Sequence, residues 1–263
     1  MIRYVTATEY NRPTTVGRTG PSIVTCELED GSFVEVVAKF SAGCEEGAIH
    51  LAREVVAASL AADLGLPVPE PFLVRIPAEW AQTISNIEMR AKIERSSPIA
   101  FGSKLVTGQF SAWGTGNKIS DIMLPTAAAI FAFDGIVQNP DRCLGNPNCL
   151  VRQDDLRIFD HEFAFSHGLV LGWKAPWVIG GLHDFAAKGN HIFREGLRGR
   201  AIDFSPIRNA WANVLDEHVQ HYMDSIPAEW TGVHQSVTRA IQLIRDARDN
   251  IGGCLDEIRR VLA

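Results

Sequence analysis

The sequence is poor in cysteine and lacks any paired cysteine motif. It has five cysteines in 263 residues, an odd number, and no two of them form a Cys-x-x-Cys pair. Because zinc ribbons and disulfide frameworks are built from such pairs, their absence argues against both as the basis of the fold. We therefore expect reduced and mostly buried thiols at Cys26, Cys44, Cys143, Cys149 and Cys254.

Long apolar runs are also missing. A transmembrane helix needs about 20 consecutive, predominantly apolar residues, and the run at residues 127–133 is far too short for that. Residues 1–10 lack the basic start and the following apolar block that are typical of a secretory signal. We therefore expect no membrane span and a cytoplasmic location.

An excess of positive charge is absent as well. The 25 lysines and arginines are outnumbered by 31 aspartates and glutamates, which gives a net charge of -6. Nucleic-acid binding usually depends on a basic surface, so this balance argues against a nucleic-acid partner. The sequence contains neither a Gly-x-Ser-x-Gly nor a Walker A motif, which leaves a serine hydrolase or a P-loop enzyme without support.

The first part of the chain is rich in expected strands. Two β-rich runs, residues 22–28 and 33–40, flank an Asp-Gly turn and predict an antiparallel hairpin. A helix is expected over residues 47–64, where apolar side chains recur at helical spacing. Further strands are expected at residues 72–76 and 99–106.

Helices dominate the second part of the chain. Residues 124–137 predict a buried apolar helix, and later helices are expected from about Ser205 and Thr231. Strands followed by helices indicate an α+β fold. We expect two lobes with a cleft between them: a small antiparallel sheet lobe with one helix at residues 1–106, and a larger, mostly helical lobe at residues 107–263.

Three polar residues have the spacing of a kinase catalytic loop and metal loop: Asp141, Asn146 and Asp160. Phosphoryl transfer needs an acidic group that faces the attacking hydroxyl, and hard oxygen ligands for magnesium. Asp141 suits the catalytic role, and Asn146 and Asp160 suit the metal. Asn148 is a second candidate amide, but the five-residue offset selects Asn146. Turn aspartates and asparagines are the structural alternative.

A lysine and a glutamate upstream suit the nucleotide phosphates. Lys39 ends the second strand of the expected hairpin, and Glu54 lies fifteen residues later on the expected helix. In kinases such a lysine pairs with the phosphates and is held by a helix glutamate. Each residue taken alone is better explained by a solvated surface position. Together with the downstream loop, the pair favours the functional role.

Small residues before the first clear strand suggest a phosphate loop. Gly17, Gly20 and Ser22 lie in a segment whose backbone amides could approach a phosphate. The segment matches no single glycine-rich template closely, and a plain turn explains it about as well.

A zinc site at His161-Glu162 is disfavoured, because no second histidine follows at the spacing of the zinc protease motif.

These residues resemble the HipA-like kinase family, a distant relation of protein kinases and of phosphatidylinositol 3- and 4-kinases. The resemblance covers most of the chain. It rests on Gly17-Arg18-Thr19-Gly20-Pro21, Val37-Ala38-Lys39-Phe40, Leu64-Gly65-Leu66-Pro67-Val68-Pro69, Phe133-Asp134-Gly135, Asn139-Pro140-Asp141-Arg142, Asn146-Pro147-Asn148 and Phe159-Asp160-His161-Glu162.

The family likeness implies a two-lobed protein-kinase-like fold that uses ATP and Mg2+. It implies Lys39 for the nucleotide phosphates, Asp141 for catalysis, and Asn146 with Asp160 for the metal. Asp160 is followed by His161-Glu162 instead of Phe-Gly, so conventional activation-loop switching does not carry over. The extra N-terminal subdomain of the toxin members is not evident, which argues against toxin activity and an antitoxin partner; a regulatory or antitoxin-like partner stays an open alternative.

Three functions are compatible with these residues. The first is an ATP-dependent kinase that phosphorylates a protein serine or threonine. The second is a kinase for a small molecule or a lipid head group. The third is a nucleotide-binding regulator without catalysis, a pseudokinase; the presence of Asp141 argues against it, and the irregular glycine segment argues for it.

Overall fold

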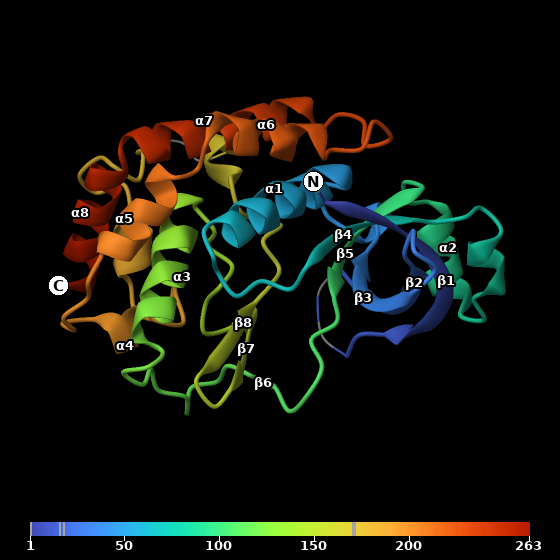
Figure 1. Cartoon of the computed structure of the whole chain (residues 1–263), viewed down its shortest axis with the longest axis horizontal. Coiled ribbons are helices and arrows are strands. Elements are labelled where there is room, and N and C mark those ends of the chain that lie inside the picture. Colours follow the sequence, from blue (N-terminus) through green and yellow to red (C-terminus); the bar gives the residue numbers. More distant parts are fainter. Residues whose placement is uncertain (1, 16, 18, 170–171) are drawn as a thin grey trace.

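Two bodies lie side by side in the structure, a computed structural model that describes residues 2–15, 17, 19–169 and 172–263. A small barrel of strands forms one end, and a larger group of helices forms the other (Figure 1). This arrangement confirms the predicted α+β fold with a sheet lobe and a helical lobe.

The sheet lobe is a closed five-stranded barrel in the order β1-β2-β3-β5-β4. Antiparallel pairing of β2 with β3 confirms the predicted hairpin, and a parallel pairing of β1 with β4 closes the ring. The one parallel pair and the closure were not expected from the sequence. The strands are β1 (Arg3–Pro13), β2 (Ser22–Glu27), β3 (Phe33–Lys39), β4 (Pro71–Arg75) and β5 (Ile99–Lys104).

Strand β3 shows why the barrel places its polar side chains as it does. Side chains alternate between the two faces of a strand. Val36 and Ala38 are fully buried in the core that fills the barrel, together with Val24 of β2 and Phe72 of β4. Lys39 therefore points away from the barrel interior, toward the helix that follows β3.

The remaining elements surround this barrel or form the second lobe. Helix α2, which the sequence did not predict, belongs to the sheet lobe. The helices are α1 (Ala48–Asp63), α2 (Ile87–Glu94), α3 (Leu124–Ile136), α4 (Arg194–Leu197), α5 (Ser205–Ala212), α6 (Asp216–Asp224), α7 (His234–Asp249) and α8 (Ile251–Leu262). The short 3-10 turns are η1 (Ser41–Gly43), η2 (Trp80–Thr83), η3 (Ser166–Leu169) and η4 (His183–Ala186). A three-stranded sheet, β6 (Ser111–Ala112), β7 (Cys149–Arg152) and β8 (Asp155–Ile158), lies in the second lobe.

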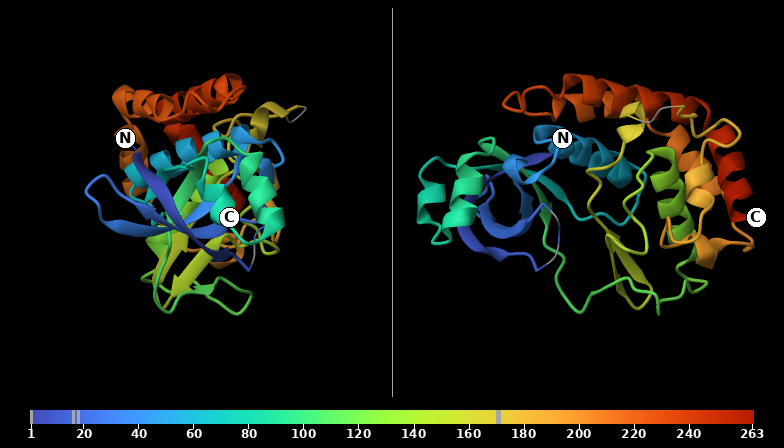
Figure 2. Two further views of the ribbon diagram at one scale, coloured as in Figure 1. Left: turned by 90° about the vertical axis from the view of Figure 1, so that its right-hand side faces the viewer. Right: turned by 180° about the vertical axis from the view of Figure 1, so that it is seen from behind.

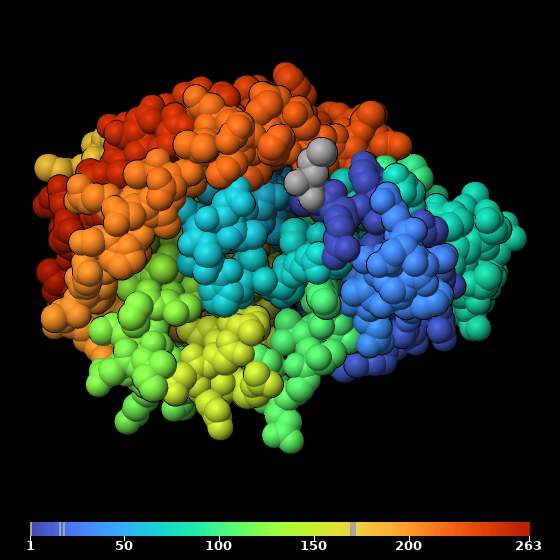
Figure 3. Space-filling view, viewed as in Figure 1, coloured from blue at the N-terminus to red at the C-terminus, as the bar shows by residue number. Residues whose placement is uncertain are grey.

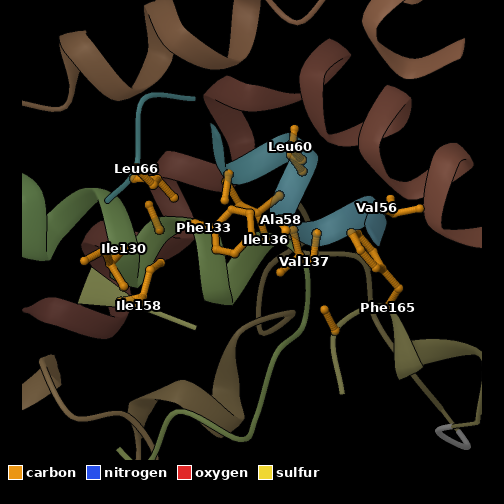
Figure 4. Packing of buried hydrophobic residues seen from close by; sticks show 14 of the residues in the cluster. Val56, Ala58, Leu60, Leu66, Ile130, Phe133, Ile136, Val137, Ile158 and Phe165 are labelled. Atoms are coloured by element: carbon orange, nitrogen blue, oxygen red, sulfur yellow. The ribbon is translucent and has the colours of Figure 1, made fainter. Parts of the chain in front are cut away.

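The main apolar core joins α1 to the helical lobe. Ala58 of α1 lies close to Phe133 and Ile136 of α3 (Figure 4), and Leu60 of α1 and Ile158 of β8 belong to the same buried cluster. Helix α1 therefore packs with the second lobe, although residues 1–106 were predicted to form one unit. The boundary near residue 106 stays a prediction, since the shared core links both sides of it.

Helices α6 and α7 lie across the outer side of α1 (Figures 1 and 2). In the space-filling view they cover one side of the molecule next to the end of α1 (Figure 3). Two hydrogen bonds fix this contact: Tyr222 donates to Asp63 at 2.5 Å, and Arg53 Nε donates to Ser236 Oγ at 3.2 Å. We call residues 216–249 the α6–α7 strap.

All five cysteines are free thiols, and all except Cys143 are buried, as the sequence predicted. Among the described residues, no helix combines the length and the apolar character needed to cross a membrane. The predicted cellular location stays a prediction.

Candidate active site

Lys39 lies at the centre of a buried charge cluster. It is 7% exposed, and its ammonium group lies 2.5 Å from Glu54 Oε1, 2.5 Å from Asp160 Oδ1 and 2.9 Å from Glu162 Oε2. Burial alone would lower the pKa of this lysine, but the three carboxylates raise it well above the usual value. Lys39 is therefore a fixed positive charge between the two lobes.

Glu54 connects this cluster to helix α1. Its carboxylate is almost fully buried and also accepts a hydrogen bond from the backbone N–H of His161 at 2.9 Å. Burial would raise the pKa of Glu54, but the ammonium of Lys39 and the side chain of His161 hold it well below its ordinary range. The predicted pair of Lys39 and Glu54 is thus brought together by β3 and α1.

Glu162 is a site residue that the sequence analysis missed. It was considered only for zinc, yet its carboxylate bonds to Lys39. Burial and the nearby Asp160 raise the pKa of Glu162 to about 7, against the opposing effect of Lys39. The available signal was that Glu162 is followed by Phe163-Ala164-Phe165 and preceded by Ile158-Phe159 across two polar residues, because a carboxylate in such an apolar setting needs a buried partner.

A second buried network supports residues 139–148, the segment predicted to be the catalytic loop. Asp134 on α3 is fully buried and accepts hydrogen bonds from Arg142 Nε at 2.7 Å and Asn139 Nδ2 at 2.8 Å. His191 Nε2 lies 3.0 Å from the same carboxylate, and His191 Nδ1 accepts from the backbone N–H of Phe193. This pattern defines a neutral imidazole with its proton on Nε2.

Protonation states in this second network follow from burial and from its partners. Burial would raise the pKa of Asp134, but Arg142 and His191 hold it far below the usual range. Burial lowers the pKa of His191, and Asp134 only partly opposes this. The sequence analysis had given no role to Asp134 or His191.

Arg142 ties the catalytic loop to the segment before Asp160. Its Nη1 donates to the backbone oxygens of Asn148 and Phe159. The N–H of Phe159 also donates to the oxygen of Asn148 at 3.2 Å. These contacts continue the β7–β8 pairing by one residue, and so place the loop that carries Asn146 beside Asp160.

Asp141 is half-buried in this loop, and two amides orient it. Asn146 Nδ2 donates to Asp141 Oδ2 at 2.7 Å, and Asn148 Nδ2 donates to the same oxygen at 3.0 Å. The structure thus assembles the predicted catalytic acid with both candidate asparagines. Asp160 itself has a positive φ of 62°, a backbone state in which aspartate and asparagine are enriched.

The glycine segment joins β1 to β2. Gly17 and Gly20 both have positive φ, and the ammonium of Lys92 on α2 donates to the carbonyl oxygens of Thr19 at 2.7 Å and Gly20 at 2.6 Å. Residues 16 and 18 lie outside the described residues. Lys92 therefore sets the shape of this segment, a role that the sequence did not indicate.

Ser22 does not face the same side as Lys39. It pairs with Ala38 across β2 and β3, so its side chain lies on the barrel-interior face with that of Ala38. It is fully buried, and its hydroxyl oxygen lies 3.5 Å from that of Tyr10 and 3.7 Å from the Met89 sulfur. The hydroxyl of Ser22 is therefore not directed at a phosphate beside Lys39.

The family model for HipA-like kinases matches residues 8–257. The chain belongs to the HipA-like kinase family. The resemblance expected from the sequence is thus confirmed over nearly the whole chain. No curated protein matches the sequence.

Comparison with solved structures gives one match with a TM-score above 0.5, to a kinase. The Helicobacter pylori proinflammatory kinase CtkA is 13% identical with a TM-score of 0.52, covering 99% of this chain and 98% of that chain. The Golgi casein kinase with Mn/ADP bound is 9% identical with a TM-score of 0.40, covering 97% and 73%. The Neurospora crassa PAN3 pseudokinase is 13% identical with a TM-score of 0.33, covering 97% and 64%. At this identity the likeness to CtkA shows the fold alone.

The side chains of this HipA-like kinase fit a divalent cation that prefers oxygen ligands. Asp160 offers a carboxylate. Asn146 donates its amide nitrogen to Asp141, so its oxygen is the end that can coordinate an ion. Magnesium is held by such carboxylate and amide oxygens in kinases. The donor set thus suits magnesium.

Proposed function

We propose that this HipA-like kinase transfers a phosphoryl group from ATP to a serine or threonine hydroxyl of a protein. One observation carries the proposal: the ammonium of Lys39 bonds to both Glu54 and Asp160, while the neighbouring loop presents Asp141. A fixed cation, a carboxylate for metal and an oriented carboxylate for the acceptor are the parts that phosphoryl transfer needs.

Each part has a task in the proposed reaction. Lys39 binds the nucleotide phosphates, and Glu54 holds Lys39 in place. Asp141 orients the acceptor hydroxyl and takes its proton, because two amides fix the direction of its carboxylate. Magnesium, held by Asn146 and Asp160, supplies charge neutralisation of the phosphates when bound.

The glycine segment contributes through its backbone in this proposal. Gly17 and Gly20 allow the chain to bend near the phosphates, and Lys92 keeps the carbonyl oxygens of residues 19 and 20 turned toward α2. Ser22 takes no direct part, since its hydroxyl faces the inside of the barrel.

A pseudokinase is the second candidate, because three carboxylates already surround Lys39. A nucleotide must displace at least part of this ion-pair cluster to reach the lysine. A small-molecule or lipid acceptor, and a regulatory or antitoxin-like partner, are further outcomes that the assay below can distinguish.

The test is phosphate transfer from labelled ATP and magnesium to total cell lysate, to the protein itself, and to small-molecule and lipid pools. We expect label on protein. Asp141→Ala should lower turnover by about 100-fold or more, since a positioned base contributes roughly 10²–10⁴-fold. Stabilisation by ATP and magnesium in thermal unfolding should persist in this variant.

The exposed Asp184 provides the matched control. Asp184→Ala should keep the parental turnover. Label on a small molecule or lipid alone would assign the alternative acceptor class. Stabilisation by ATP without any transfer in the parental protein would support the pseudokinase, and unchanged turnover in Asp141→Ala would remove the assigned role of Asp141.

A further inference from the structure

Beside the Lys39 cluster lies a second group of buried side chains that the proposed reaction does not use. A ring nitrogen of His50, the sulfur of Cys44 and a carboxylate oxygen of Glu162 all lie within 4.8 Å of one another. All three residues are buried. They come from three separate segments: the end of η1, the first turn of α1, and the turn after Asp160.

His50 gives the independent sign that a ligand belongs here. Its Nδ1 is buried and has no hydrogen-bond partner among the described residues, while its Nε2 lies 3.3 Å from Glu46 Oε1. Leaving a buried polar atom unpaired costs about 1–3 kcal/mol. The contact with Glu46 fixes one ring nitrogen, as carboxylates do for histidines that bind metals, and leaves Nδ1 as the other donor.

We propose that Cys44, His50 and Glu162 form a binding site for Zn2+ or a similar divalent transition metal. Thiolate, imidazole and carboxylate are the ligand types of zinc, with bond lengths of about 2.0–2.3 Å. Tetrahedral bonds of that length place ligand atoms roughly 3.3–3.8 Å apart, so shifts on the order of 1 Å close the site. A sulfur and a nitrogen donor select against magnesium.

This site shares Glu162 with the carboxylates around Lys39, and its other two ligands, Cys44 and His50, do not belong to that group. Glu54, Asp160 and Glu162 also have oxygens within 4.8 Å of one another, but the ammonium of Lys39 bonds to all three. The positive charge among these three carboxylates is therefore the ammonium group of Lys39. In the set with Cys44 and His50, the ammonium of Lys39 bonds to Glu162.

Metal binding has a consequence for Lys39. Glu162 bonds to the ammonium of Lys39 at 2.9 Å and is also the shared carboxylate of the proposed zinc site. Coordination draws this carboxylate toward the metal, and the zinc ion displaces the proton of the Cys44 thiol. Bound zinc therefore removes one of the carboxylates around Lys39 and links the start of α1 to the turn after Asp160.

The test uses the full chain after treatment with a chelator, with cobalt(II) as a spectroscopic probe. We expect one cobalt ion per chain, tetrahedral visible bands, and a thiolate-to-cobalt charge-transfer band in the near ultraviolet. Zinc should displace the cobalt stoichiometrically. Cys44→Ser should abolish the charge-transfer band, and His50→Gln should weaken cobalt binding about 100-fold, because even outer-shell changes weaken metal binding 10–100-fold.

Two controls separate this site from the rest of the molecule. Cys254→Ser removes another buried thiol and should leave the band intact. Asn146→Ala removes a proposed magnesium ligand and should also leave it intact, whether or not the protein transfers phosphate. Absence of the band in the wild-type protein overturns the proposal without recourse to any variant. A band that survives Cys44→Ser, or is lost with Cys254→Ser, overturns it as well.

Discussion

At the scale of single residues, the buried charge of Lys39 matters both for stability and for the proposed binding of phosphate. Lys39 is held by carboxylates from α1 and from the turn at residues 160–162. Removing one partner of a buried ion pair leaves an uncompensated charge, which is far more destabilising than the loss of a surface pair. The same side chain therefore serves both the proposed phosphate binding and the contact between lobes.

Lys39→Met should lower the free energy of unfolding by about 3 kcal/mol or more, because buried carboxylates lose their cation. Urea denaturation at neutral pH measures this change. Lys104→Met, at an exposed lysine on β5, is the control and should change stability by less than about 1 kcal/mol. Equal stability of the two variants would contradict the structural part of the assignment.

His191 should make the protein sensitive to acid. Its folded-state pKa is lowered by burial, so the unfolded chain binds the proton more readily and stability falls as pH drops below about 6.5. His191→Gln removes this titration. We expect the stability of the wild type, relative to the variant, to fall between pH 7.5 and pH 5.

Urea denaturation of both proteins across that pH range provides the measurement. The raised pKa of Glu162 acts in the opposite direction, since its folded form keeps a proton that the unfolded chain releases between about pH 4.5 and 7. This contribution is common to both proteins and cancels in the comparison. A constant difference between them at all pH values would remove the role given to His191.

Sequence spacing could predict Lys39, Glu54 and Asp160 because each stands at a recognisable place in its own element. It could not predict Asp134 or His191. These residues lie 57 positions apart. Nothing in the sequence around either of them indicates that their side chains bond to each other. The sequence could predict that Asp141 and Asn146 lie in one loop, but not that their side chains form a hydrogen bond.

At the scale of elements, the glycine segment depends on a helix that the sequence did not reveal. Helix α2 is short, largely polar and only partly buried, so apolar periodicity gave no signal for it. Its Lys92 nevertheless reaches the carbonyl oxygens of Thr19 and Gly20. The shape of the segment between β1 and β2 is thus set by tertiary contact more than by its own residues.

Lys92→Met should release these two carbonyl oxygens and weaken ATP binding by roughly 10-fold, equivalent to about 1.4 kcal/mol. Thermal stabilisation by ATP and magnesium at several nucleotide concentrations measures the change. Lys104→Met again serves as the control. An unchanged affinity for ATP in Lys92→Met would show that the segment does not contact the nucleotide.

At the scale of the whole molecule, the α6–α7 strap holds the two lobes together. Trp230 lies between α6 and α7 and donates its ring N–H to the backbone oxygen of Ile99 in β5 at 2.9 Å. Tyr222 and Ser236 bond to α1 in the same region. The sequence predicted helices here but not their position, because amphipathic helices indicate that a face is covered and not which element covers it.

Trp230→Ala should lower the free energy of unfolding by about 3–5 kcal/mol, the usual loss for a buried tryptophan. Trp230→Phe should lose only about 1 kcal/mol of hydrogen-bond energy together with a smaller loss of packing. Thermal and urea unfolding measure both. If Trp230→Ala were as stable as a variant at the exposed Leu215, the strap would not hold the lobes together.

The burial of α1 on both sides has a biological consequence. Protein kinases are commonly silenced by moving the helix glutamate away from its lysine. Here Glu54 lies on α1, which packs against α3 on one side and against the α6–α7 strap on the other. This packing leaves little room for α1 to move into an inactive position. For the proposed kinase, we therefore expect activity in a cell to depend on how much of the protein is synthesised and how fast it is degraded. Natural selection would then act on the amount of the protein in the cell, and not on a switch between an active and an inactive conformation.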